Sequence, residues 1–190
     1  MNALQDDDGL VVDGTRHNVV NNQLVVITYP DSGTAVTGLE TLGDAANAAI
    51  CPGSVPAGKY TRQALVNAGI LEEVEDVSTI EGTTISEAFG GLEITEADNV
   101  SKAALAVAEQ SCEVGTCYYS DTYGMEDQLE VLEVVSYDLT GDIIYPIAQV
   151  VNEEADELEQ AAAVDFINFI ISEQAKGVFD SYYFDTDVED

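Results

Sequence analysis

The residues best suited to chemistry lie between two prolines and in the helix-forming residues that follow. The run reads Pro52-Gly53-Ser54-Val55-Pro56-Ala57-Gly58-Lys59-Tyr60-Thr61-Arg62. An apolar stretch ends just before it, so the run predicts a strand end, a tight loop and a helix start. The first N–H groups of a helix have no partner within it, and the helix dipole favours an anion there. The run therefore predicts either an ordinary strand-to-helix turn or an anion-binding loop, in which Gly58 would let a ligand approach the backbone.

The overall charge limits the choice of partner. The chain has 190 residues, with 37 acidic and 5 basic side chains, and a formal net charge of −32. Nucleic acid and anionic lipid are therefore poor partners, and such a surface is typical of salt-adapted or secreted proteins. Three basic residues, Lys59, Arg62 and Lys102, nevertheless lie near two predicted helix starts. A cation opposes the dipole there, so we interpret these charges as attracting an anion, with chance placement as the alternative.

The other reactive side chains indicate neither a metal site nor a nucleophile. Cys51, Cys112 and Cys117 show no metal-ligand spacing, and Asp6-Asp7-Asp8-Gly9 lacks the later ligands of an EF-hand loop. A disulfide between the last two cysteines would be strained by their short separation, so buried free thiols are expected. The single histidine, His17, has no serine or cysteine nearby in sequence and is interpreted as a surface residue.

An acidic pair such as Asp121 with Glu126 is the enzymatic alternative, in the manner of a hydrolase. Acidic pairs are easy to find in a chain with 37 acidic residues. No nucleophile and base are suggested beside this pair. The sequence therefore favours a binding protein without catalytic residues.

Alternating apolar runs and amphipathic stretches predict an α/β protein. The continuous apolar run Leu24–Ile27 suits a sheet that is buried on both faces. Strands that alternate with helices favour three layers with parallel strands. Strands are expected within 18–29, 48–51, 115–119, 129–135 and 143–151. Helices are expected within 1–9, 39–46, 60–68, 100–110 and 153–171, and residues 174–182 close the fold.

Three further expectations concern the surface and the longest helix. The acidic, glycine-containing stretch 72–98 is interpreted as a surface insertion, and residues 185–190 as a solvated tail. The helix within 153–171 is expected to bury an apolar stripe. That stripe comprises Leu158, Ala161, Ala162, Val164, Phe166, Ile167 and Ile170.

Several motifs together resemble a known family. The segment VPAGKYTRQALVNAGI is preceded by LVVITYPDSG and followed by CYYSDT and IIYPIAQV. In this order the motifs resemble the periplasmic molybdate-binding proteins of ABC transporters, over residues 1 to about 184, and VPAGKYT is the most specific mark. The resemblance implies a type II periplasmic-binding-protein-like α/β fold, with two three-layer lobes joined by a two-strand hinge. Residues 1–28 and 145–190 would form what remains of the first lobe, and 29–144, including the hinge crossings, the second. One continuous open sheet is the alternative.

The resemblance also implies a ligand and the groups that hold it. The ligand would be molybdate, with tungstate as a close analogue and no further cofactor or metal. By motif, the backbone N–H groups of Ala57 and Val100 and the hydroxyl of Tyr118 would donate to its oxygens. Alternation along a strand would place Tyr118 and Ser120 on one face. A core tyrosine is the alternative for Tyr118.

The implied role is that of an extracytoplasmic solute-binding component, periplasmic or lipid-anchored, that acts as a monomer and delivers the anion to a membrane permease. A relative that binds sulfate or phosphate, and a truncated product that does not bind, are the alternatives. The family carries two serine ligands in βα units ahead of the region that matches Asn2, and the opening MNALQDDDGL has no signal peptide. We therefore expect weak or undetectable anion binding by these 190 residues alone, and binding by a longer form.

Overall fold

The computed structural model describes residues 1–189, which form two compact units. One unit comprises Met1–Asn22 together with residues 143–189, and the other comprises Gln23–Asp142. The chain thus passes between the units at residues 22/23 and 142/143. The sequence placed the first boundary after residue 28. It lies earlier because residues 24–28 pair with strands of the second unit.

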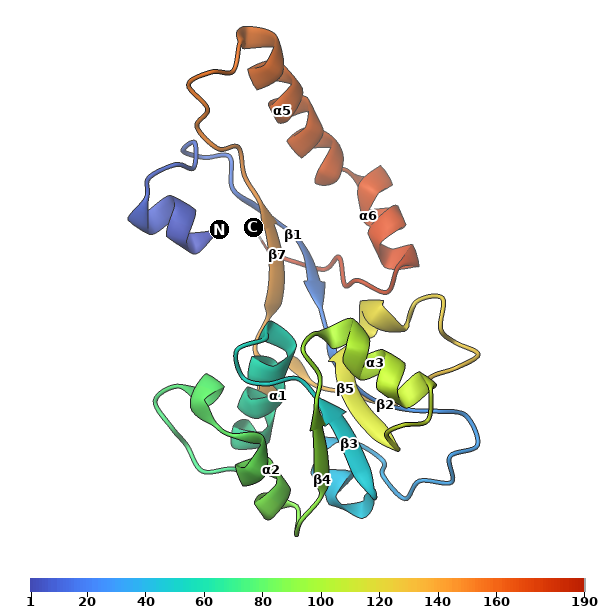
Figure 1. The fold of residues 1–190 in the computed structure, drawn as a ribbon. Helices are drawn as coiled ribbons and strands as arrows, with labels where there is room; N and C mark the ends of the chain where they lie inside the picture. Colours follow the sequence, from blue (N-terminus) through green and yellow to red (C-terminus); the bar gives the residue numbers. More distant parts are fainter. Residues whose placement is uncertain (190) are drawn as a thin grey trace. The chain divides into compact units, whose positions relative to one another are not determined.

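The second unit is built on a five-stranded mixed sheet with the order β4-β3-β5-β2-β6 (Figure 1). Its strands are β2 (Leu24–Thr28), β3 (Asn47–Ile50), β4 (Glu93–Glu96), β5 (Val114–Tyr118) and β6 (Glu130–Val134). β3 runs parallel to β4 and β5, whereas β2 runs antiparallel to both β5 and β6. The expectation of parallel strands is therefore confirmed for β3, β4 and β5 and wrong for the pairing of β2. Strands alternating with helices indicate parallel neighbours only where a helical crossover joins them, and none joins β2 to its neighbours.

Helices cover both faces of this sheet. The α-helices are α1 (Pro56–Asn67), α2 (Gly82–Ala88), α3 (Val100–Ala108) and α4 (Tyr137–Thr140), and the 3-10 helices are η2 (Leu39–Asp44), η3 (Val77–Thr79) and η4 (Tyr119–Thr122). Leu24 and Val26 of β2 pack in one apolar cluster with α1, while Val25 and Ile27 pack in another with α3. Alternate side chains of one strand therefore enter two cores. This arrangement confirms the three-layer architecture that the apolar run predicted.

The stretch 72–98 is not a surface insertion. It contains η3, α2 and β4, and β4 extends the sheet beside β3. Val77, Ile80, Ile85 and Leu92 from this stretch are buried in the core. The acidic composition of the stretch concealed the few apolar residues that attach it.

The first unit contains an antiparallel pair of strands and two α-helices. Its elements are η1 (Ala3–Asp7, a π-helix), β1 (His17–Asn22), β7 (Ile143–Ile147), α5 (Glu157–Ile170) and α6 (Glu173–Ser181). Asp185 forms an isolated bridge with Asn21 of β1, so the expected tail is attached at its start. Residue 190 lies outside the described residues.

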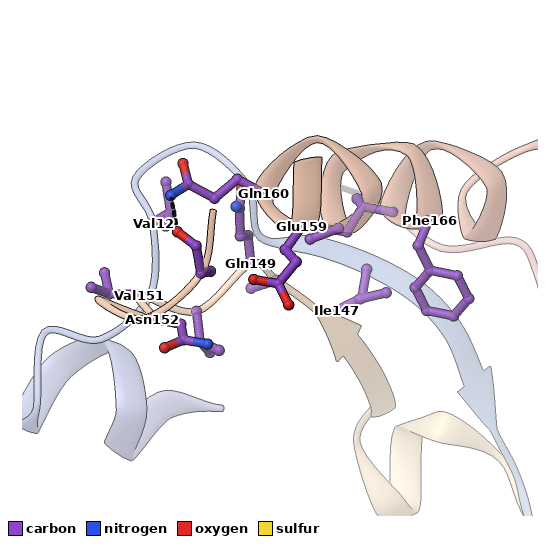
Figure 2. Close-up of a pocket in the computed structure, with 13 residues that line it drawn as sticks. Val12, Ile147, Gln149, Val151, Asn152, Glu159, Gln160 and Phe166 are labelled. Atoms are coloured by element: carbon purple, nitrogen blue, oxygen red, sulfur yellow. Dashed lines mark hydrogen bonds between the residues drawn. The ribbon is translucent and has the colours of Figure 1, made fainter. Parts of the chain in front are cut away.

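The apolar stripe of α5 is not buried as expected. Of that stripe only Ile167 is buried, whereas Leu158 is 80% and Phe166 is 58% exposed. The periodicity is present in the sequence, but within residues 1–189 no sheet layer covers this face of the helix. A groove of about 540 Å³ lies between α5 and the segment after β7 (Figure 2). Figure 2 shows Ile147 and Phe166 toward one end of the groove, with Gln149 and Glu159 between them and Val12.

Candidate anion-binding site

The three predicted donors each follow one of three parallel strands. Ala57 lies in the first turn of α1, which follows β3, and Val100 is the first residue of α3, which follows β4. Tyr118 is the last residue of β5. The carboxyl ends of parallel strands lie at the same edge of a sheet, where ligands of open α/β sheets commonly bind. The topology thus brings the three residues to one edge of the second unit.

The loop before α1 is held by backbone bonds and by close packing. Val55 donates its N–H to the carbonyl of Pro52 at 3.0 Å and, as the N-cap residue, accepts from the N–H of Lys59 at 2.9 Å. The N–H of Ala57 precedes this first helical bond and therefore has no acceptor within the helix. The side chain of Ala57 is 1% exposed. The helix starts four residues before the predicted start at residue 60, because Pro56 suits its first position.

Gly58 serves a different purpose from the one predicted. A Cβ on Gly58 would lie 2.2 Å from the carbonyl oxygen of Pro52 and 2.3 Å from that of Cys51. The missing side chain therefore makes room for the preceding loop. The close approach at this glycine is between two parts of the backbone, and a ligand is not needed to explain it.

The start of α1 is tied to β5 by two buried threonines. The hydroxyl of Thr61 donates to the carbonyl of Ala57 at 2.9 Å and lies 3.0 Å from the hydroxyl of Thr116. Both threonines are at most 1% exposed. Thr116 precedes Tyr118 by two residues in β5. This contact therefore connects α1, which contains Ala57, to β5, which contains Tyr118.

The second helix start has a regular cap. Asn99 is the N-cap residue of α3, and its side-chain oxygen accepts the N–H of Lys102 at 2.9 Å. Lys102 forms an exposed ion pair with Asp98. The N–H of Val100 comes before the first bond of the helix and, like that of Ala57, has no intrahelical acceptor.

The three basic residues differ from one another in their surroundings. Lys59 is exposed, and Lys102 is paired with a carboxylate. Arg62 is 1% exposed and bonds to backbone carbonyls, so its guanidinium does not face solvent. The interpretation of these residues as a group of exposed attractors is therefore wrong for Arg62. It belongs to the second turn of α1, where its side chain packs inward.

The chain turns immediately after Tyr118. This residue is 8% exposed, and η4 begins at Tyr119. The alternation that would have placed Tyr118 and Ser120 on one face does not apply, because residues 119–122 are not extended. Asp121 of η4 accepts a hydrogen bond from the backbone of Tyr118.

Burial alters the acidity of three groups on this side of the unit. Burial raises the pKa of the Cys51 thiol to about 11 and that of the Cys117 thiol well above its ordinary value. Burial also raises the pKa of the Asp121 carboxyl above its ordinary value. The two thiols therefore stay protonated and weakly nucleophilic at neutral pH. All three cysteines are buried and free, as expected. Within residues 1–189 no three His, Cys, Asp or Glu side chains gather as a metal site.

Asp121→Asn is expected to stabilise the protein at pH 7 by ~1 kcal/mol or less. A carboxyl whose pKa is raised on folding stabilises the fold below its unfolded pKa, and this contribution is lost as the pH rises through the folded pKa. Asparagine keeps the acceptor for Tyr118 without the charge. Urea unfolding between pH 4 and pH 8 measures the effect, with the exposed Asp127→Asn as the charge-matched control. Equal stabilities of Asp121→Asn and wild type at pH 8 would contradict this assignment.

The second unit has an α/β fold, a mixed sheet covered by helices on both faces. The chain belongs to the family of bacterial extracellular solute-binding proteins, whose profile matches residues 1–185. Proteins of this family bind solutes and are not enzymes, which excludes the hydrolase alternative. None of the helices in residues 1–189 is long and apolar enough to cross a membrane.

Individual relatives agree with this family. One relative is YvgL of Bacillus subtilis, described as a proposed ABC transporter substrate-binding lipoprotein. The two sequences are 23% identical over 179 residues, and the alignment includes 94% of this chain and 61% of YvgL. The substrate-binding domain of a proposed molybdenum ABC transporter from Clostridium difficile superimposes with a TM-score of 0.75 at 26% identity, covering 98% of this chain and 72% of that one. The periplasmic molybdate-binding protein of Azotobacter vinelandii superimposes with a TM-score of 0.65 at 17% identity, covering 94% and 71%. The chain thus spans about three-fifths of the length of its curated relative.

Sequence reasoning missed the structural role of Arg62 and the partial burial of Asp121. For Arg62 a signal was present, since its position four residues after Gly58 places it on the same helical face. For Asp121 there was none, because nothing in YYSDT distinguishes a partly buried carboxylate from the many other acidic residues of this chain.

Proposed function

We propose that this protein captures molybdate, with tungstate as a close analogue, outside the cytoplasm and delivers it as a monomer to the permease of an ABC importer. The proposed ligands are the N–H groups of Ala57 and Val100 and the hydroxyl of Tyr118. The observation that carries the proposal is the origin of these groups at the ends of β3, β4 and β5, which are parallel neighbours in one sheet. The likeness to the Clostridium difficile domain adds support.

Neutral donors suit this ligand and this chain. A tetrahedral oxyanion offers four oxygens with two negative charges to disperse, and hydrogen bonds to a charged group contribute about 1.5–3 kcal/mol each. Helix N-termini add a favourable dipole. With a net charge of −32, the protein repels an anion at long range, so short-range bonds must supply the affinity. Three donors leave oxygens of the anion without partners. For this reason we expect weak or undetectable binding by residues 1–190, and tighter binding where a longer form supplies further donors.

Tyr118→Phe should weaken molybdate binding by roughly ten- to a hundredfold, the equivalent of one hydrogen bond to a charged acceptor. Isothermal titration or equilibrium dialysis measures the change. Tyr119→Phe removes the neighbouring hydroxyl outside the proposed donor set and serves as the matched control, with an affinity near that of wild type. Equal affinities of Tyr118→Phe and wild type would remove Tyr118 from the proposed site.

Other oxyanions are compared in the same experiment, because a fold does not determine its ligand. Titrations with molybdate, tungstate, sulfate and phosphate under matched ionic strength distinguish them. The proposal predicts that molybdate and tungstate bind at least tenfold more tightly than the other two. Preference for sulfate or phosphate would replace the proposed ligand with one of these.

A further inference from the structure

Arg62 is the largest side chain of the protein that is almost fully buried, with 1% exposure. Its Nε donates to the carbonyl of Ile80 at 2.6 Å, and Nη1 donates to those of Cys51 at 2.7 Å and Gly58 at 3.0 Å. Nη2 lies 3.4 Å from Oε1 of Glu96. Arginine keeps its charge in proteins, so these acceptors replace water around a buried cation.

The acceptors come from four different elements. The carbonyl of Cys51 directly follows β3, that of Gly58 belongs to the first turn of α1, and Ile80 directly follows η3. Glu96 is the last residue of β4. A single planar guanidinium therefore links both ends of the loop 51–58 to Ile80 and to Glu96 of β4. Among side chains, only the guanidinium of arginine has enough N–H donors in one plane for this arrangement.

The same loop is packed against backbone on two sides. A Cβ on Gly53 would lie 2.0 Å from the carbonyl oxygen of Ser78 in η3, and one on Gly58 would lie 2.2 Å from that of Pro52. The glycines allow these close contacts, and the guanidinium bonds to carbonyls at the two ends of the loop. Ala57 lies inside the segment that is fixed in this way.

We infer that Arg62 is a positioning residue that holds the loop 51–58, and with it the N–H of Ala57, in the orientation that receives the anion. This inference rests on the proposed function for its ligand, whereas its effect on the loop is independent of any ligand. Burial lowers the pKa of the guanidinium, and the carboxylates of Glu96 and Glu81 oppose this effect. Glu96 offsets part of the positive charge of Arg62. We therefore infer that Arg62 contributes by fixing the loop rather than by attracting the anion through its charge.

The test compares Arg62→Lys, Arg62→Gln, Glu96→Gln and wild type in the full 190-residue chain. Amide hydrogen exchange is measured by NMR at Val55 and Lys59, whose N–H groups donate to carbonyls of the loop. Amides of β5 serve as the reference. We expect both Arg62 variants to speed exchange in the loop at least tenfold relative to β5, and Glu96→Gln to leave it near wild type. Ile85→Ala, a core variant in α2, should speed exchange across the unit without singling out the loop.

Molybdate titration of the same proteins completes the test. Arg62→Lys keeps the charge but not the fork, so the inference predicts that it loses roughly ten- to a hundredfold in affinity, as Arg62→Gln does. Wild-type affinity in Arg62→Lys with a loss in Arg62→Gln would show that charge alone matters and would overturn the inference. Unchanged loop exchange in both variants would also overturn it. If the loop opens selectively in both Arg62 variants while neither they nor wild type bind molybdate, the structural role of Arg62 stands and its link to the anion fails.

Discussion

Replacing Gly58 with alanine is expected to destabilise the second unit by about 3 kcal/mol and to abolish measurable molybdate binding. The added Cβ would meet the carbonyl oxygens of Pro52 and Cys51 at 2.2 and 2.3 Å. These are backbone atoms, which cannot move away as a flexible side chain can. The loop that contains Ala57 must then shift. Urea unfolding and a molybdate titration of the same variant measure the two effects.

A second helical glycine provides the matched control. Gly177 lies in α6, and a Cβ there would meet nothing within 4 Å. Gly177→Ala should therefore stabilise its helix by up to about 1 kcal/mol, because alanine has the higher helix propensity. A Gly58→Ala protein as stable as wild type would show that the loop adapts, and the close packing described above would lose its significance.

Asn21→Ala is expected to cost about 2–3 kcal/mol through a different part of the molecule. Asn21 is 4% exposed, and its side-chain oxygen accepts the N–H of Ile143 at 2.6 Å and that of Asn22 at 3.0 Å. Removing that oxygen leaves the buried N–H of Ile143 without this acceptor where β7 begins. The free energy of unfolding of the first unit, followed by hydrogen exchange at Asp185, measures the loss, because the backbone of Asp185 pairs with Asn21.

The control for this change lies on the same strand. Asn18 donates its side-chain amide to the carbonyl of Glu189 at the surface, where water can replace the bond. Asn18→Ala should therefore cost less than about 1 kcal/mol. Similar losses for the two variants would mean that the buried acceptor of Asn21 contributes little.

The sequence predicted those features that depend on local pattern. Four consecutive apolar residues in β2 predicted burial on both faces, and Leu24 and Val25 do enter opposite cores. The amphipathic stretch 100–110 predicted α3, which begins at Val100. Each of these depends only on residues that are close together in the chain, and such signals are the most readable in a single sequence.

Features that depend on distant partners could not be predicted in this way. The periodicity of α5 indicated an apolar face but not what would cover it, so Phe166 was expected inside and lies 58% exposed. Arg62 was expected to attract an anion because it lies near a predicted helix start, where a cation opposes the helix dipole. Its acceptors at Cys51 and Ile80 come from separate elements. The antiparallel pairing of β2 likewise depends on strands nearly a hundred residues later.

The most direct test of the central claim is an NMR titration of the isotope-labelled 190-residue protein with molybdate. This measurement detects even weak binding and reports on the proposed donors individually. The proposal predicts saturable shifts of the N–H signals of Ala57 and Val100 with one common dissociation constant, reproduced by tungstate and absent with sodium chloride of equal ionic strength. Shifts confined to other surfaces, or none at these two amides at saturating molybdate, would contradict the claim that this edge of the sheet binds the anion.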